Sequence, residues 1–152
     1  MKMQWKSKTK WEPITIKENM SPNAASVGPE TSAKDIARVL RDRKIGCVPV
    51  MENDRLIGMI TDRDITIRTV AEGRDAGSAT ARDIMSAPVC VCHQDDLLAD
   101  AAQIMEDNHV RRLPVLDRDE RLVGILTSDD LAWHTDHRLL GDVIQSVYER
   151  HG

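Results

Sequence analysis

The sequence predicts a mixed fold of helices and strands (α/β, of the α+β type), in which two copies of one small unit pack sheet to sheet around a pseudo-twofold axis. A segment recurs at a constant offset, which from Met20 to Met85 is 65 residues. Hydrophobic residues make up 41% and charged residues 30% of the 152 residues, the balance of a soluble globular protein. One copy of roughly sixty residues buries too little surface to be stable alone, so the two copies are expected to share a core.

The repeat opens on a Met-Ser pair at residues 20–21 and 85–86 and continues into a predicted helix in each copy. Residues 33–40 and 98–105 place apolar side chains at helical spacing, which forms one apolar stripe per helix. The matched positions are Ala33, Ile36, Ala37, Val39 and Leu40 with Leu98, Ala101, Ala102, Ile104 and Met105.

Two strands follow the helix in each copy. Residues 47–50 and 112–115 are short apolar runs that each contain a proline, and residues 56–61 and 122–127 are runs that end on a threonine. The second copy gains one residue in the polar turn between its strands, as expected of a hairpin loop.

Each second strand carries a glycine at its middle, Gly58 in the first copy and Gly124 in the second. Glycine weakens a strand unless a bulge or a close backbone approach requires it. Its recurrence at the same place therefore predicts a packing requirement.

A short helix closes each unit at residues 62–65 and 128–131, so the order is strand, helix, strand, strand, helix. Beyond the second unit, Leu139, Val143 and Val147 lie on one face of a predicted helix that packs on the module or across a dimer contact. The predicted division is a basic N-terminal tail at 1–13, a first unit at 14–73, a linker at 74–81, a second unit at 82–136 and a C-terminal helix at 137–152.

The most informative recurrence is a threonine followed three residues later by an aspartate, in Thr61 with Asp64 and in Thr127 with Asp130. One interpretation is a capping box, in which threonine and aspartate satisfy the first backbone groups of a helix. The other is that the carboxylate accepts hydrogen bonds from the vicinal diol of a ribose, while the helix start faces a phosphate. The residues alone leave both open.

The prolines of the preceding strands are the second candidate feature. Because proline cannot donate to a ladder, it is confined to sheet edges or strand ends. Backbone groups around residues 47–48 and 112–113 are then available to pair with the edge of a purine ring. A guarded sheet edge is the alternative.

Taken in order and spacing, these motifs resemble the cystathionine-beta-synthase (CBS) domain pair over roughly residues 14–136. The resemblance implies βαββα units, a disc-like homodimer of pairs, and an adenosyl ligand: AMP, ADP, ATP, S-adenosylmethionine or a dinucleotide. Carried over by position, the ligand-binding residues are Thr61, Asp64, Thr127 and Asp130 at the riboses, and Cys47, Val48, Pro49, Arg112, Leu113 and Pro114 beside the base.

Arginines are the candidates for phosphate, because guanidinium pairs with it in a bidentate manner. They are Arg63, Arg111 and Arg112. The position of Arg63 is taken by Asp129 in the second copy, so we expect the two sites to differ in phosphate preference.

Metal binding and catalysis are not predicted. The Cys90-Val91-Cys92-His93 stretch resembles a metal cluster but lacks a second ligand pair at zinc-finger spacing. His134 and His137 lie one helical turn apart without further ligands. No nucleophile elbow, phosphate-binding glycine loop, catalytic triad or zinc protease motif occurs, so we expect neither an enzyme nor a catalytic cofactor.

Net charge and cysteine usage define the remaining expectations. A net charge of -4 with 3% aromatic residues makes nucleic acid an unlikely partner. An odd number of cysteines without a secretory segment predicts a cytoplasmic protein, and no apolar run reaches the roughly 20 residues of a membrane span. The sequence thus predicts a regulatory sensor that signals to an unknown partner protein. The alternatives are a constitutive structural or oligomerisation module, and contact with nucleic acid or an anionic surface through the lysine- and tryptophan-bearing residues 1–12.

Overall fold

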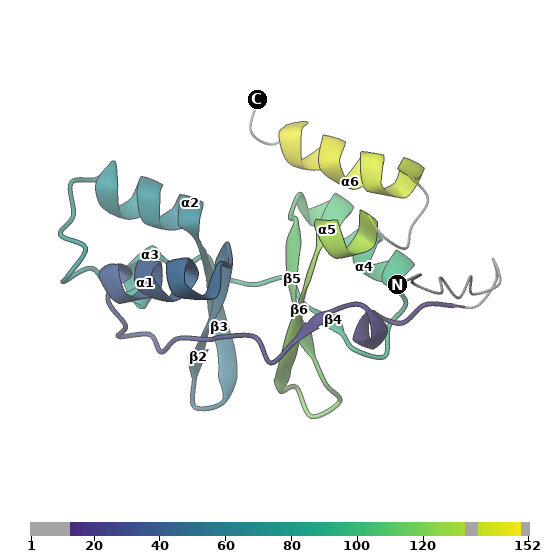
Figure 1. The fold of residues 1–152 in the computed structure, drawn as a ribbon, viewed down its shortest axis with the longest axis horizontal. Helices are drawn as coiled ribbons and strands as arrows, with labels where there is room; N and C mark the ends of the chain where they lie inside the picture. Colours follow the sequence, from purple (N-terminus) through teal and green to yellow (C-terminus); the bar gives the residue numbers. More distant parts are fainter. Residues whose placement is uncertain (1–12, 133–136, 150–152) are drawn as a thin grey trace, which may run out of the picture.

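The computed structural model describes residues 13–132 and 137–149, with side chains left out for 137–140. The expectations for the N-terminal arm and for His134 fall outside these residues. The predicted repeat is confirmed as two α+β units of matching order (Figure 1). The first comprises α1 (Ala33–Arg43), β2 (Cys47–Glu52), β3 (Arg55–Thr61) and α2 (Asp62–Ile65), and the second α4 (Leu98–Asn108), β5 (Arg112–Leu116), β6 (Leu122–Thr127) and α5 (Ser128–Ala132).

The two units face each other through their sheets, with helices on the outer sides (Figure 1). Along a strand, alternate side chains point to opposite faces. Val48 and Ile60 are fully buried in the core between sheet and helices of the first unit, whereas Cys47 points to the other face. There it packs with Met59 and with Ile125 of the second unit. The sheet-to-sheet contact is thus made by one face of each hairpin.

The segment that leads into each unit crosses to the other one. The strand β1 (Ser21–Pro22) pairs with β6, and Ile16 of the preceding η1 (Ile16–Glu18) is fully buried in the core of the second unit. In return, α3 (Ala81–Ile84) contributes to the core of the first unit, and Ser86 pairs with Met59. Residues 14–22, grouped with the first unit by sequence, therefore lie on the second.

The crossing explains the two glycines, and the predicted close approach is confirmed. A Cβ on Gly58 would collide with the Sδ of Met85, and a Cβ on Gly124 would lie 2.7 Å from both the Sδ of Met20 and the main-chain oxygen of Ser21. The Met-Ser pair of each crossing segment therefore lies directly on the glycine of the other unit.

The hairpins follow the expected pattern, with one difference. Of the two strands that contain a proline, β2 lies at a sheet edge as expected, whereas β5 does not. Asn53 and Asp54 adopt φ of 50° and 61° in the tight turn of the first hairpin, and the second hairpin carries the longer loop 117–121. Among the described residues, β2 pairs only with β3 and carries an isolated bridge from Val27, while β5 lies between β6 and β4 (Cys92–His93). Strand β4 is so short that it pairs only with Val115 and Leu116, which leaves the start of β5 uncovered on that side.

The remaining helices lie outside the repeat. The π-helical η2 (Thr66–Val70) extends α2. Helix α6 (His137–Glu149) packs on α4 and α5, and its Val143 is fully buried in the core of the second unit. Within residues 13–132 and 137–149, no helix has the length and apolarity needed to cross a membrane.

Candidate functional site

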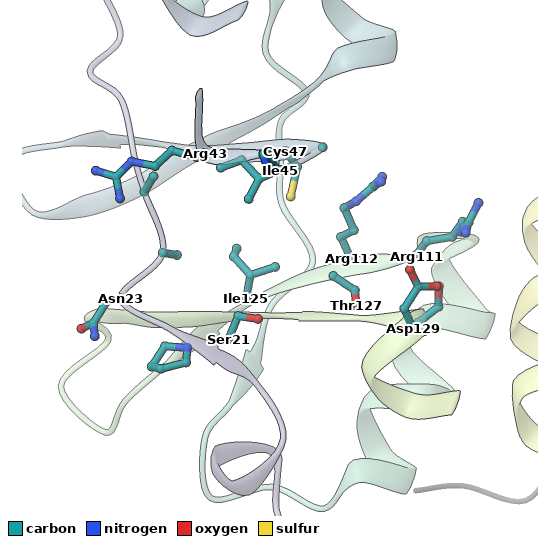
Figure 2. Close-up of a pocket in the computed structure, with 16 residues that line it drawn as sticks. Ser21, Asn23, Arg43, Ile45, Cys47, Arg111, Arg112, Ile125, Thr127 and Asp129 are labelled. Carbon is teal, nitrogen blue, oxygen red and sulfur yellow. The ribbon is translucent and has the colours of Figure 1, made fainter. Parts of the chain in front are cut away.

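Two related clefts lie between the units. The first, here called the Thr127 cleft, has a volume of about 420 Å³ and is lined by residues 21–25, 43–47, 111–112, Ile125 and 127–129 (Figure 2). It therefore takes walls from a crossing segment, from the end of α1 and from both strands of the second hairpin. Its volume falls within the usual range of small-molecule sites.

The second, the Thr61 cleft, is related to the first by the pseudo-twofold axis and measures about 770 Å³. Met59, Thr61 and Arg68 line it from the first unit, and the crossing segment 85–90 forms another wall. Asn108, Val110 and Arg112 contribute from the second unit, and Asp83 from α3. Arg112 lines both clefts.

Each threonine of the repeated motif stands at a cleft wall and caps a helix. The Thr61 N–H and hydroxyl donate to Asp64 Oδ2 at 2.8 and 3.0 Å, and the Asp64 N–H donates to Thr61 Oγ1 at 3.2 Å. Thr127 and Asp130 form the same three bonds at 2.8, 2.9 and 3.3 Å. The capping-box interpretation is thus realised in both copies. The aspartates themselves are held beside the threonines rather than in the cleft lining.

The same caps occur away from the predicted motif. Thr15 and Glu18 make a capping box on η1, outside both clefts, and Thr80 and Asp83 make one on α3. The bonds alone therefore do not identify a ligand site. The position of Thr61 and Thr127 at the clefts does distinguish them from Thr15.

The residues expected beside the base divide into two groups. Cys47 and Arg112, each the first residue of its strand, line the clefts. The side chains of Val48 and Leu113 are fully buried in the cores of their own units. Pro49 and Pro114 are buried as well, and the Pro49 carbonyl accepts the N–H of Val27 at 3.0 Å.

The predicted phosphate residues are also divided. Arg111 and Arg112 line the Thr127 cleft, whereas Arg63 is exposed and lines neither cleft. Sequence reasoning missed Arg68, which lines the Thr61 cleft and donates to the Ile84 carbonyl at 2.8 Å. Its spacing was the available signal, because seven residues after Thr61 a helix returns to the same face.

Arg43 and Lys44 were missed for another reason. They end α1 of the first unit but line the cleft of the second unit's threonine. Nothing in the local sequence indicates which residues face each other across the units.

Burial dominates the titration of Cys47 and Cys92. It raises the pKa of the Cys47 thiol, a shift that the nearby Arg112 guanidinium partly offsets. Burial raises the pKa of Cys92 to about 12. Cys92 lies in the core of the second unit, and Cys90 packs against that core and lines the Thr61 cleft. Within the described residues, no cluster of His, Cys, Asp and Glu side chains is arranged to hold a metal ion.

Comparison with known proteins agrees with this arrangement. A family model described as the CBS domain matches residues 13–68 and 81–134. The CBS domain-containing protein YhcV of Bacillus subtilis is 37% identical over 118 residues, which are 78% of this chain and 83% of YhcV.

Two similar solved structures hold adenosyl ligands. The CBS domain pair of protein MJ0100, in complex with 5'-methylthioadenosine and S-adenosyl-L-methionine, superposes with a TM-score of 0.73 at 27% identity, over 86% of this chain and 98% of that chain. CBSX2 in complex with AMP superposes with a TM-score of 0.65 at 27% identity, over 91% of this chain and 99% of that chain.

Proposed function

The chain belongs to the CBS-domain family, with two CBS domains in tandem, and we propose that it is a non-catalytic regulatory module that binds an adenosyl ligand between them. The candidates are AMP, ADP, ATP, S-adenosylmethionine and a dinucleotide. The observation that carries the proposal is the pair of clefts with a threonine at corresponding walls. The ligands in the MJ0100 and CBSX2 structures support the adenosyl class.

The ribose binds at the capped threonines. In each cap, Oδ2 of the aspartate is occupied by the threonine N–H and hydroxyl. The second carboxylate oxygen then accepts from the ribose diol, as an acidic residue does in dinucleotide folds. In the first unit this oxygen, Asp64 Oδ1, already lies 3.6 Å from Arg68.

The base binds against the starts of β2 and β5. Backbone groups alternate in direction along an antiparallel strand. Since Pro49 presents its carbonyl to Val27 on the side away from β3, Cys47, two residues earlier, presents its own N–H and C=O to that side. These groups are suited to the edge of a purine, and Ile125 offers an apolar surface in the same cleft.

Signalling follows from the position of the ligand. A molecule that contacts both units binds best at one relative orientation of the units, and it shifts the equilibrium by its difference in affinity between orientations. A partner protein, in a cytoplasmic setting, then responds to that orientation. We also propose that the chain forms a homodimer.

The alternative function is a constitutive structural module without ligand sensing. The capping box of Thr15 and Glu18 favours it, because two of the bonds of the cleft caps recur there, outside both clefts.

Isothermal titration of the full chain with adenosine, AMP, ADP, ATP and S-adenosylmethionine separates the two functions. Asp64→Asn and Asp130→Asn keep an oxygen for the cap but remove the charge, so we expect each to weaken binding about tenfold at its own cleft. Glu18→Gln is the matched control, because it alters an equivalent cap outside the clefts. The proposal is overturned if no ligand binds the wild-type chain, or if Glu18→Gln weakens binding as much as the cleft variants do.

A further inference from the structure

The two units differ at two corresponding positions, at the start of the first strand of each hairpin. In the second unit these are Arg111 and Arg112, and in the first they are Gly46 and Cys47. Arg112 pairs with Thr127 across the hairpin, as Cys47 pairs with Thr61. Both of these guanidinium groups line the Thr127 cleft, whereas the Thr61 cleft has only that of Arg112, which the two clefts share.

The charges at the Thr127 cleft are available to a ligand. Among the described residues, Arg111 and Arg112 form no ion pair, and Asp129 is the only acidic residue in the lining. Figure 2 shows Arg111 and Arg112 at the same end of the cleft as Thr127 and Asp129, with Arg43 at the opposite end. Arg43 and Lys44 add positive charge to the other end of the lining.

The Thr61 cleft offers less positive charge to a ligand, because it shares Arg112 with the other cleft and adds only Arg68. Arg68 is already engaged, since its guanidinium donates to the Ile84 carbonyl at 2.8 Å and lies 3.6 Å from Asp64. Asp83 adds a carboxylate to this lining, and hydrogen bonds from Thr80 lower its pKa, which keeps it ionised. Met59, Met85 and Val89 make the rest of the wall more apolar.

From this asymmetry we infer that the Thr127 cleft is the site for an adenine nucleotide with a di- or triphosphate, and the Thr61 cleft the site for an adenosyl ligand of lower negative charge. The inference rests on the proposed function. Guanidinium binds phosphate oxygens in a bidentate manner, and two adjacent guanidinium groups match the successive phosphates of a polyphosphate. It keeps the expected difference in phosphate preference but does not rest on Arg63, which lines neither cleft.

Asp129 provides a test of opposite sign. Its carboxylate stands at the arginine end of the cleft and repels phosphate. Removing it should strengthen polyphosphate binding, whereas removing the neighbouring guanidinium should weaken it. A change in folding alone does not produce this pair of effects.

The experiment is isothermal titration of the full chain with ATP and, separately, with adenosine. We expect Arg111→Gln to weaken ATP binding about tenfold and Asp129→Asn to strengthen it a few-fold, both with adenosine binding unchanged. Arg111→Lys, which keeps charge but not the planar fork, should lie between wild type and Arg111→Gln. Arg63→Gln is the matched control and should leave both ligands unaffected. Raising the salt concentration should weaken the binding of ATP and leave the binding of adenosine unchanged.

NMR titration locates the bound ligand. ATP should shift the amide resonances of Thr127 and Ser128 at lower concentrations than those of Thr61 and Arg68. The inference is overturned if Arg63→Gln weakens ATP binding as much as Arg111→Gln does, or if Arg111→Gln weakens adenosine binding as much as ATP binding. It is also overturned if the Thr61 resonances shift at lower ATP concentrations than those of Thr127. In those cases adenosine still binds and the proposed function stands. If neither ATP nor adenosine binds the wild-type chain, the inference is refuted, and the proposed function is refuted with it if AMP, ADP and S-adenosylmethionine also fail to bind.

Discussion

Replacing Gly124 by alanine tests the crossing segments directly. The new Cβ would lie 2.7 Å from the Ser21 main-chain oxygen and 2.7 Å from Met20 Sδ. Because Ser21 is paired with β6 in β1, its oxygen cannot withdraw without loosening that pairing. Overpacking of this kind costs up to about 3 kcal/mol. The lower chain entropy of alanine in the unfolded state returns about 0.5–1 kcal/mol, so the net loss is about 2 kcal/mol.

Urea titration measures this loss, and a loss of that size should lower the Tm by about 4–8 °C in a chain of this length. Gly58→Ala provides the matched comparison, because there the colliding atoms belong only to the side chain of Met85. Met85→Ala should therefore recover much of the stability lost in Gly58→Ala, while Met20→Ala should recover little in Gly124→Ala. Equal recovery in the two pairs, or a Gly124→Ala chain as stable as the wild type, would refute the argument.

Three further predictions concern stability and reactivity. Val143→Ala, at a fully buried position of α6, should cost about 2 kcal/mol in urea titration, whereas Tyr148→Ala, at a position 71% exposed, should change stability by less than about 0.5 kcal/mol. Hydrogen bonds from Thr80 lower the pKa of Asp83, so its contribution to stability is present above the ordinary value of about 4 and is lost as the pH falls below it. Asp83→Asn should therefore flatten the stability profile below about pH 4. With its pKa raised to about 12, Cys92 should resist iodoacetamide at pH 8 in the native protein, whereas the partly exposed Cys90 should react, as mass spectrometry of native and unfolded samples will show.

Local patterns were sufficient to predict the units themselves. The apolar stripe of residues 33–40 predicted α1, and the run that ends at Thr61 predicted β3, because each signal lies within one element. A leading strand was predicted for each unit, but its pairing with the opposite unit was missed. Strand β1 contains only Ser21 and Pro22, too few residues to show a period, and its partner β6 lies about a hundred residues away in sequence.

The candidate site was predicted where the chemistry lies within one motif. Thr61 and Thr127 were found because a strand end and a helix cap coincide there. The candidate Arg63 is exposed and lines neither cleft, since the register of a short helix decides whether a side chain turns to the cleft or to solvent. Arg43 and Lys44 reach the cleft through the packing of two units, which no single segment encodes.

Because each crossing segment packs on the other unit, the chain is equivalent to a domain-swapped dimer whose two halves are joined by the linker between the units. A fragment cut at residue 73 keeps β1 but lacks the β6 on which that strand pairs, and the complementary fragment keeps α3 without the core that buries Ile84. Each half thus holds what the other requires, and two separately produced fragments should fold only on mixing. The crossing segments also line both clefts. A nucleotide bound there would therefore hold the two halves together where these segments cross.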